Sequence, residues 1–345
     1  MKDRKRMNEE RTSIFSKIKR MVKDKAYDLQ VAAYAKRSHK KTKNMDRAKR
    51  ADLIFYIAII ALPIVQACIF YIGVNFNSFL LGFQEYNVET FKYEFKGLVN
   101  FKRIWDDITR QKTMLICLKN SLLAYAVTIG ISLPLTLFFS YFIYKKMLGA
   151  GLFKVLLFVP QIIPSMILAT MYLFFCNYSV PAISEEVTGE KAVGLFSQGT
   201  GTMLAALLFF QVFTGFGSGV IMYSSTMGGI DESIVEAAKL DGANALQEFW
   251  HITLPLIFPT LSTFVTVGVA GIFTNQLGLF ALFGASGDAY VECWTFGYFL
   301  YAKTVNAGPA MYPELSAYGL ILTAVAVPLV YLMKFLLAKL GPSLD

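Results

Sequence analysis

Six long apolar runs constrain the fold of this chain more than any other feature of its sequence. About 20 apolar residues are needed to cross a hydrocarbon core about 30 Å thick. Six stretches reach that length: residues 53–75, 120–144, 152–176, 201–227, 258–283 and 315–338. Because 55% of the 345 residues are hydrophobic, a soluble domain of this composition would be hard to keep in solution. We therefore predict an all-α integral membrane protein with six transmembrane helices.

Charged side chains are almost absent from these runs, which contain Lys154 and Lys334 but no Asp, Glu, Arg or His. A proton- or sodium-driven carrier usually needs an ionisable group or a broken-helix ion site near the midplane. A channel needs a selectivity filter or a ring of charges, and the sequence shows neither. We therefore expect any pumping to draw its energy from another subunit, and a passive channel is the weaker alternative.

The first 50 residues are strongly basic, since they contain 18 of the 33 Lys and Arg residues against 6 acids. The positive-inside rule places such a segment in the cytoplasm, and six spans then return the C-terminus to the same side. We divide the chain into a basic cytoplasmic tail, residues 1–50, and a transmembrane domain, residues 51–345. Residues 83–117, assigned to the outside, hold six Lys or Arg, but five acids are interleaved with them.

Within the tail, apolar residues recur at helical spacing with lysines and arginines between them. The apolar residues are Ile14, Phe15, Ile18, Met21, Val22 and Leu29. This pattern is typical of an amphipathic helix lying on anionic membrane lipid. A disordered, solvated tail that only fixes the orientation fits the sequence equally well. We expect no nucleic-acid binding, because a tail tethered to a membrane is poorly placed for it.

One long polar segment, residues 228–258, separates the fourth and fifth runs. Acids near its start lie where a helix N-terminus favours negative charge, and Ser233 with Glu236 has the spacing of a capping box. Gly242 suits the left-handed turn that ends a helix. Asn244 can then cap a second helix. The segment is therefore predicted to form a helix–turn–helix elbow.

The same segment resembles the EAA loop that marks the membrane subunits of binding-protein-dependent ABC importers. The residues that match at the family's spacing are Glu236, Ala237, Ala238, Gly242, Ile252, Leu254 and Pro255. The resemblance assigns ATPase coupling to Glu236, Ala237, Ala238, Asp241, Gly242, Leu254 and Pro255. Glu-Ala-Ala alone is common in helices. Its position between the fourth and fifth of six runs, with the later matches at the family's spacing, makes the signal specific.

Two further segments resemble the carbohydrate branch of these permeases. Phe95-x-Gly97-Leu98-x-Asn100-Phe101 is similar to a segment of that branch's outer loop, and Asn120-Ser121 is similar to the start of its next helix. The branch often carries T-x-G-G-P after the fifth span. Here residues 283–287 read Phe-Gly-Ala-Ser-Gly instead, so the outer gate departs from the pattern.

The resemblance implies a type I ABC importer permease with six transmembrane helices in a prokaryotic plasma membrane. It implies that loop 228–258 docks on a dimer of ATP-binding subunits. It also implies a second permease subunit, an extracellular solute-binding protein and a sugar or oligosaccharide as substrate. A permease for a non-carbohydrate solute is the alternative.

The sequence gives little support for catalysis by this chain. Its two histidines, His39 and His251, lie in no metal-binding pattern, and its four cysteines lack CxxC spacing. There is no glycine-rich phosphate loop of the GxxxxGK[ST] kind. We therefore predict a subunit that is not an enzyme and binds no metal or cofactor, with ATP and magnesium held by the partner ATPase.

A substrate path for sugars needs uncharged hydrogen-bonding groups inside the spans. The main candidates are Gln211, Thr214, Asn275 and Gln276, within a wider set that adds Gln161, Tyr223 and Thr274. We expect the paired amides of the fifth span and Gln211 of the fourth to form a neutral polar patch near mid-membrane. A hydrogen bond to a neighbouring helix is the alternative role for each of these side chains. Gly215, Gly217 and Gly219 suit close helix packing or a cavity lining.

Overall fold

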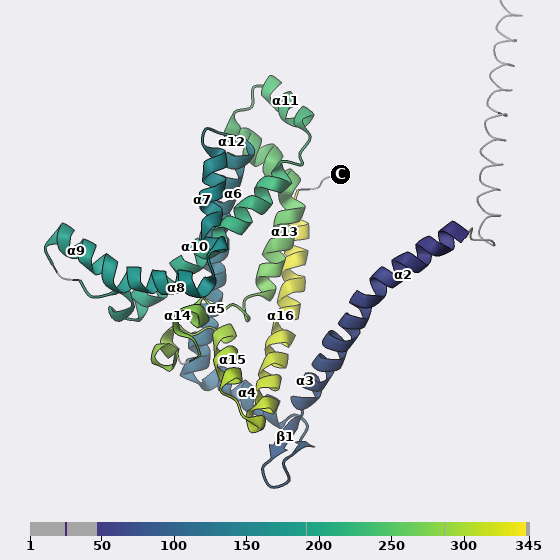
Figure 1. Ribbon diagram of the computed structural model, residues 1–345, viewed down its shortest axis with the longest axis vertical. Helices are drawn as coiled ribbons and strands as arrows, with labels where there is room; N and C mark the ends of the chain where they lie inside the picture. The colour runs from purple at the N-terminus through teal and green to yellow at the C-terminus, as the bar shows by residue number, and fades with distance from the viewer. Residues whose placement is uncertain (1–24, 26–46, 191, 286, 343–345) are drawn as a thin grey trace, which may run out of the picture. The chain divides into compact units, whose positions relative to one another are not determined.

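The computed structural model describes residue 25 and residues 47–190, 192–285 and 287–342 (Figure 1). The predicted basic tail and its amphipathic helix lie almost wholly outside the described residues. The chain forms two compact units, residues 1–75 and 76–345. In the first, α2 (Arg47–Ala67) continues into a π-helical turn, η2 (Cys68–Val74). The side chains from Leu53 to Ile72 are exposed, as expected of a helix that lies in lipid or against another protein.

The second unit begins with a short helix and a hairpin. Helix α3 (Asn75–Leu81) leads into β1 (Gln84–Asn87), which pairs antiparallel with β2 (Lys92–Phe95). This hairpin departs from the all-α prediction. The buried Asn100 amide donates to the carbonyl oxygens of Gly82 at 3.2 Å and Gln84 at 2.7 Å, so the family-like outer-loop segment fastens the hairpin to the next helix.

Helices form the rest of the second unit. Before the polar loop these are α4 (Val99–Arg110), α5 (Lys112–Val127), η3 (Thr128–Ser132), α6 (Leu133–Tyr144), α7 (Ala150–Ile162), α8 (Ser165–Phe174), η4 (Phe175–Ser179), α9 (Val180–Thr188), η5 (Leu195–Ser197) and α10 (Thr200–Met227). From the polar loop onward they are α11 (Glu232–Leu240), α12 (Ala245–Glu248), η6 (Phe249–Thr253), α13 (Leu254–Ala270), α14 (Leu279–Phe283), η7 (Gly287–Cys293), α15 (Phe296–Val305), η8 (Pro309–Met311) and α16 (Tyr312–Leu340).

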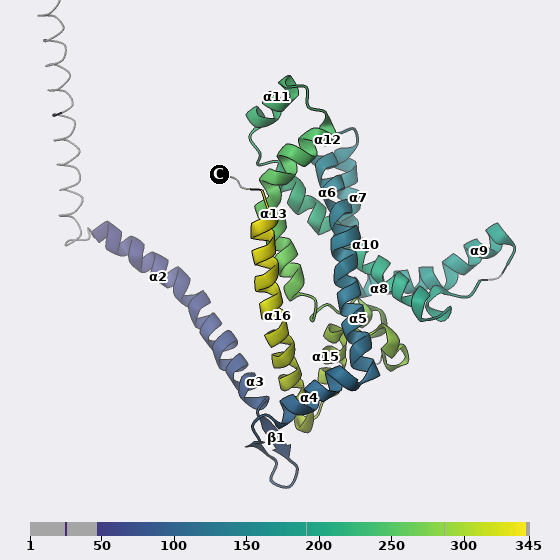
Figure 2. The same cartoon turned by 180° about the vertical axis from the view of Figure 1, so that it is seen from behind.

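The described residues contain six helices long and apolar enough to cross a membrane, which confirms the predicted number. They are Leu53–Leu81, Lys112–Tyr144, Ser165–Thr188, Thr200–Met227, Ala245–Ala270 and Pro309–Lys339. Helix α10 packs against α6 and α7, and α13 lies beside α16 in both views (Figure 2). The loop that carries α11 and α12 lies at one end of this helix bundle (Figure 1).

The third span differs from its prediction as a single run over residues 152–176. Helix α7 stops at Ile162, and Ile163 and Pro164 have extended backbone before α8 begins. The proline explains the break, because its ring disfavours a helical conformation at the preceding residue and it has no N–H to donate. Helices α8 and α9 consequently turn away from α7 (Figure 1).

The fifth span also ends earlier than the predicted 258–283. Helix α13 stops at Ala270, and the chain then turns through Leu277 and Gly278, whose φ values are +53° and +73°. The Asn275 side-chain oxygen accepts a hydrogen bond from the Leu277 N–H at 2.8 Å and so stabilises this turn. Asn275 and Gln276 therefore lie in an irregular segment, and their placement inside a helix was wrong.

The main apolar core lies where α5, α10, α15 and α16 approach the segment after α13. Trp294, Phe296 and Tyr298 are buried there. Asn120, one of the two family-like residues of the second span, donates to the carbonyl oxygens of Glu292 and Trp294, both at 3.0 Å. A buried amide thus holds the backbone before α15 against α5.

Close contacts explain two of the four glycines of α10. A Cβ on Gly217 would lie 2.1 Å from the Leu157 carbonyl oxygen of α7, and one on Gly219 would lie 2.8 Å from the Thr136 methyl group of α6. Gly215 has no such neighbour within 4 Å. The fourth span therefore uses Gly217 and Gly219 for close helix packing.

Candidate functional site

Helix α11 carries the Glu-Ala-Ala residues and begins at a different cap from the predicted one. Asp231 is the N-cap, and its carboxylate accepts a hydrogen bond from the Ser233 N–H at 2.9 Å. This bond lowers the pKa of Asp231. The predicted capping box of Ser233 and Glu236 was wrong, because the helix starts at Glu232 and Ser233 is already inside its first turn.

The end of α11 agrees with the prediction. Gly242 follows the C-cap Asp241 and has a φ of +85°, in the left-handed region. The Ala243 N–H then donates to the Ala238 carbonyl oxygen at 3.0 Å, which satisfies a carbonyl at the helix end. A Cβ added to Gly242 would meet no atom within 4 Å, so only backbone conformation favours glycine here.

The surface of α11 divides into a buried and an exposed face. Val235 and Ala238 are buried, whereas Glu236 and Ala237 are exposed. Leu240, on the same helix, is 89% exposed. Glu236 lies one turn before the protruding Leu240, so this exposed helix offers a partner protein both a charged contact and an apolar one.

The second half of the elbow is also capped as predicted. The Asn244 side-chain oxygen accepts from the Gln247 N–H, and the Gln247 side chain accepts from the Asn244 N–H, both at 2.9 Å. Leu254 and Pro255 then open α13, where Leu254 packs against a buried cluster that includes Met227. The matched residues at the two ends of the loop therefore have distinct positions, one set on an exposed helix and the other at the entry to a span.

Sequence reasoning missed a contact between this loop and the second span. Glu248, which is buried, forms an ion pair with Lys145 at the C-terminal end of α6. The Tyr141 hydroxyl donates to the Ala245 carbonyl oxygen at 2.8 Å. A lysine at a predicted span end and an acid in the polar loop were visible in the sequence, but nothing in the sequence paired them.

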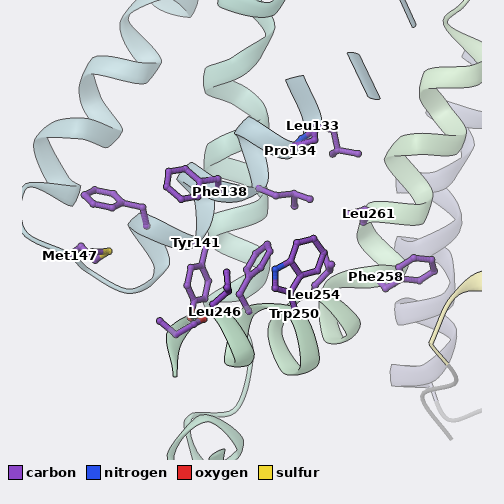
Figure 3. A pocket seen from close by; sticks show the side chains of 14 residues that line it. Leu133, Pro134, Phe138, Tyr141, Met147, Leu246, Trp250, Leu254, Phe258 and Leu261 are labelled. Atoms are coloured by element: carbon purple, nitrogen blue, oxygen red, sulfur yellow. Dashed lines mark hydrogen bonds between the residues drawn. The ribbon is translucent and has the colours of Figure 1, made fainter. Parts of the chain in front are cut away.

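An apolar groove of about 600 Å³ lies beside this contact, between α6 and the α12–α13 segment (Figure 3). Its walls are Leu133, Pro134, Leu137, Phe138, Tyr141, Phe142, Met147, Ala245, Leu246, Phe249, Trp250, Leu254, Phe258 and Leu261. Trp250 and Leu246 remain more than half exposed. The groove offers apolar contact and no charge.

The predicted polar patch is brought together in part. The Asn275 side-chain N–H donates to the Gln211 oxygen at 3.2 Å, and the Gln211 N–H donates to the Thr128 hydroxyl at 2.8 Å. Thr214 instead donates to the Phe210 carbonyl oxygen of its own helix at 2.8 Å. Gln276 is half-buried next to Asn275. Gln211 and Asn275 thus form one neutral cluster between α10 and the segment after α13.

The chain has known relatives in sequence. Residues 128–345 match the family described as the binding-protein-dependent transport system inner membrane component. The multiple sugar-binding transport system permease protein MsmF of Streptococcus mutans is 25% identical over 65% of this chain and 76% of its own. The polygalacturonan/rhamnogalacturonan transport system permease protein YteP of Bacillus subtilis is 25% identical over 81% of this chain and 88% of its own.

The fold has known relatives as well. One chain of a bacterial ABC transporter involved in the import of the acidic polysaccharide alginate superposes with a TM-score of 0.70, covering 85% of this chain and 99% of that one at 15% identity. The family match covers well over half of the sequence, and the six apolar helices agree with it. This chain therefore belongs to the binding-protein-dependent transport system inner membrane components, the multi-pass permease subunits of prokaryotic ABC importers, in which a separate subunit hydrolyses ATP.

Proposed function

We propose that this permease takes up a sugar or oligosaccharide and that α11 is the element that docks on its ATP-binding subunits. The exposed α11–Gly242–α12 elbow between the fourth and fifth of six apolar spans is the observation that carries the proposal. Relatives named for sugar and polygalacturonan transport support a carbohydrate substrate. In this assignment Glu236 and Ala237 face the ATPase, Ala238 supports them from the buried face of α11, and ATP and magnesium are bound by that partner.

The partners follow from the same assignment. A dimer of ATP-binding subunits meets α11, and a second permease covers part of the apolar surface that this chain leaves exposed. A solute-binding protein delivers the substrate from outside, as the name of the family indicates. The loop 228–258 then lies in the cytoplasm with both chain termini, and residues 1–50 form a basic tail on that side, against membrane lipid.

Copurification tests the function directly. The affinity-tagged chain, expressed with the transport genes that adjoin its own, should retain an ATP-binding subunit and a second permease. A panel of neutral and acidic oligosaccharides, each added with the purified binding protein, should then include one that stimulates ATP hydrolysis. A complex that forms but responds only to glycerol 3-phosphate would favour the alternative, a permease for a non-carbohydrate solute. Relatives named for sn-glycerol-3-phosphate transport are 24% identical over 59% of this chain.

Cysteine labelling tests the membrane topology. Ser233→Cys on α11 and Ser13→Cys in the tail should resist a membrane-impermeant maleimide in intact cells and react after permeabilisation. Ser286→Cys, beyond the fifth span, should react in intact cells, because an odd number of spans separates it from the tail. Cys68, which is exposed, is first changed to serine. Labelling of position 13 in intact cells would contradict the proposed orientation.

We also propose that Gln211, Thr214, Asn275 and Gln276 lie along the substrate path. Asn275→Leu combined with Gln276→Leu should lower uptake while leaving ATPase assembly intact, because α11 is untouched. The single Gln276→Leu variant separates substrate contact from folding better, because the Asn275 side chain also accepts the hydrogen bond from the Leu277 N–H that stabilises the turn. Transport assays on membranes of equal permease content decide the matter. Normal uptake by both variants would place the substrate contacts elsewhere.

A further inference from the structure

The polar loop is fastened to the second span by its α12 half. Glu248 pairs with Lys145, and the Tyr141 hydroxyl donates to the Ala245 carbonyl oxygen at 2.8 Å. The ring of Tyr141 also meets the ring of Phe249 edge to face, with centroids 5.0 Å apart. Three contacts of different kinds thus join the C-terminal end of α6 to α12 and the first residue of η6.

The ion pair is the most directional of these contacts and is largely removed from water. The Glu248 side chain is 3% exposed and the Lys145 side chain is 20% exposed. Replacing a buried ion pair by well-packed apolar residues is often neutral or stabilising, so stability alone accounts poorly for two charges here. Lys145 is also the C-cap of α6, where a cation is favoured by the helix dipole. The pair fixes the position of α12 relative to the axis of α6.

Helix α6 connects this point to the middle of the bundle. The Ser140 hydroxyl, buried one turn from Lys145, donates to the Val220 carbonyl oxygen of α10 at 3.1 Å. Gln211, farther along α10, belongs to the neutral cluster with Asn275. The Gly242–Asn244 turn links α11 to α12 along the chain, and contacts run on from α12 through α6 to α10, with the Lys145–Glu248 pair as the junction between loop and span.

We propose that Lys145 and Glu248 are positioning residues through which a displacement of α11 is passed to α6 during the transport cycle. The proposal rests on the proposed docking of α11 on an ATPase. When the ATPase moves α11, the pair keeps α12 and the end of α6 together, and the π-helical turn η6 between α12 and α13 takes up the bend, so that α6 shifts against α13. Without the pair, α12 can slide along the apolar groove walls and the displacement is lost at the loop.

Spin labels can follow this movement without knowledge of the transported solute. Cysteines replace the exposed residues Phe138 of α6 and Val267 of α13 in a Cys68→Ser background, whose other three cysteines are buried. The assembled transporter in lipid is then measured before and after trapping with Mg-ATP and vanadate. The distance between the labels should change on trapping in the otherwise unaltered permease.

The informative variant removes both charges at once, Lys145→Met with Glu248→Leu, because this change leaves no buried charge unpaired. It should keep its ATPase subunits and hydrolyse ATP, yet lose the trapping-dependent shift, with transport per ATP lowered about tenfold. Lys145→Arg, which can still pair with Glu248, should retain the shift. Lys146→Met, at the neighbouring exposed lysine, is the matched control and should also retain it.

A shift that persists in the double variant would overturn the proposal, as would the lack of any shift in the unaltered permease. These results are separable from a failure of α11 docking. Glu236→Lys tests docking through the amount of ATPase that copurifies, whereas the double variant is compared at equal bound ATPase. Normal ATPase binding by Glu236→Lys would contradict the docking of α11 on the ATPase. The label distances in the double variant would still decide whether the Lys145–Glu248 pair passes a displacement to α6.

Discussion

Changing Glu236 to lysine should abolish most uptake by weakening the association between this permease and its ATPase. In the proposed docking, the exposed Glu236 carboxylate forms a charge-assisted hydrogen bond of about 1.5–3 kcal/mol with a cation of the ATPase, and a lysine at this position would lose that bond and repel the cation. Because about 1.4 kcal/mol is a factor of ten, ATPase binding should fall by roughly 10-fold to 150-fold. Copurification at a fixed permease concentration measures the loss.

The matched control for this change is Glu186→Lys, an equal charge reversal at an exposed residue of α9. It should assemble and transport normally. Gly242 provides an independent check, because its φ of +85° costs an ordinary L-residue about 1–2 kcal/mol and no neighbour blocks a side chain. Uptake should decrease in the order Gly242→Asn, Gly242→Ala, Gly242→Val. Equal uptake by all three would show that the left-handed turn is unimportant.

The second large effect is expected at the helix crossing of α7 and α10. A Cβ on Gly217 would lie 2.1 Å from a backbone oxygen, so Gly217→Ala must push α10 away from α7. Overpacking of this kind costs about 1–3 kcal/mol and occasionally more. Gly217→Leu should cost more still and remove most folded permease from the membrane. Detergent-solubilised yield and the temperature of unfolding measure both changes.

Gly215→Ala, two residues earlier on the same helix, is the matched control. Its new methyl group would meet no atom within 4 Å, and alanine favours a helix over glycine. It should therefore leave the yield unchanged or raise it slightly. If Gly215→Ala and Gly217→Ala lowered the yield equally, helix propensity and not the α7 contact would have to explain both results.

The number of spans and the elbow could be predicted because they depend on local properties of the chain. Apolar runs of sufficient length define the spans, and Gly242 and Asn244 define the turn through backbone preference and side-chain capping. The start of α11 was misplaced by this local reasoning, since Asp231 and Ser233 both make good N-caps. Only the observed bond to the Ser233 N–H distinguishes them.

The remaining differences arise from contacts between distant parts of the chain. The end of α13 is set by the turn at Asn275, whose carbonyl oxygen also accepts from the Thr295 hydroxyl at 2.6 Å, whereas the predicted uncharged run 258–283 extends through that turn. The Lys145–Glu248 pair joins residues a hundred positions apart, and neither residue matches a family motif. A glycine that packs, such as Gly217, looks the same in sequence as one that does not, such as Gly215.

The π-helical turn η3 gives the second span an unequal stiffness along its length. A π-turn holds more residues than an α-turn and has a wider hydrogen-bonded ring. We therefore expect η3 to be the most easily twisted part of the second span, which consists of α5, η3 and α6. Torsion applied to the Lys145 end is taken up at this turn before it reaches α5. Thr128, whose hydroxyl oxygen accepts a hydrogen bond from the Gln211 side-chain N–H, is the first residue of η3. We therefore expect a twist of the second span to change the surroundings of the neutral cluster before it reaches α5.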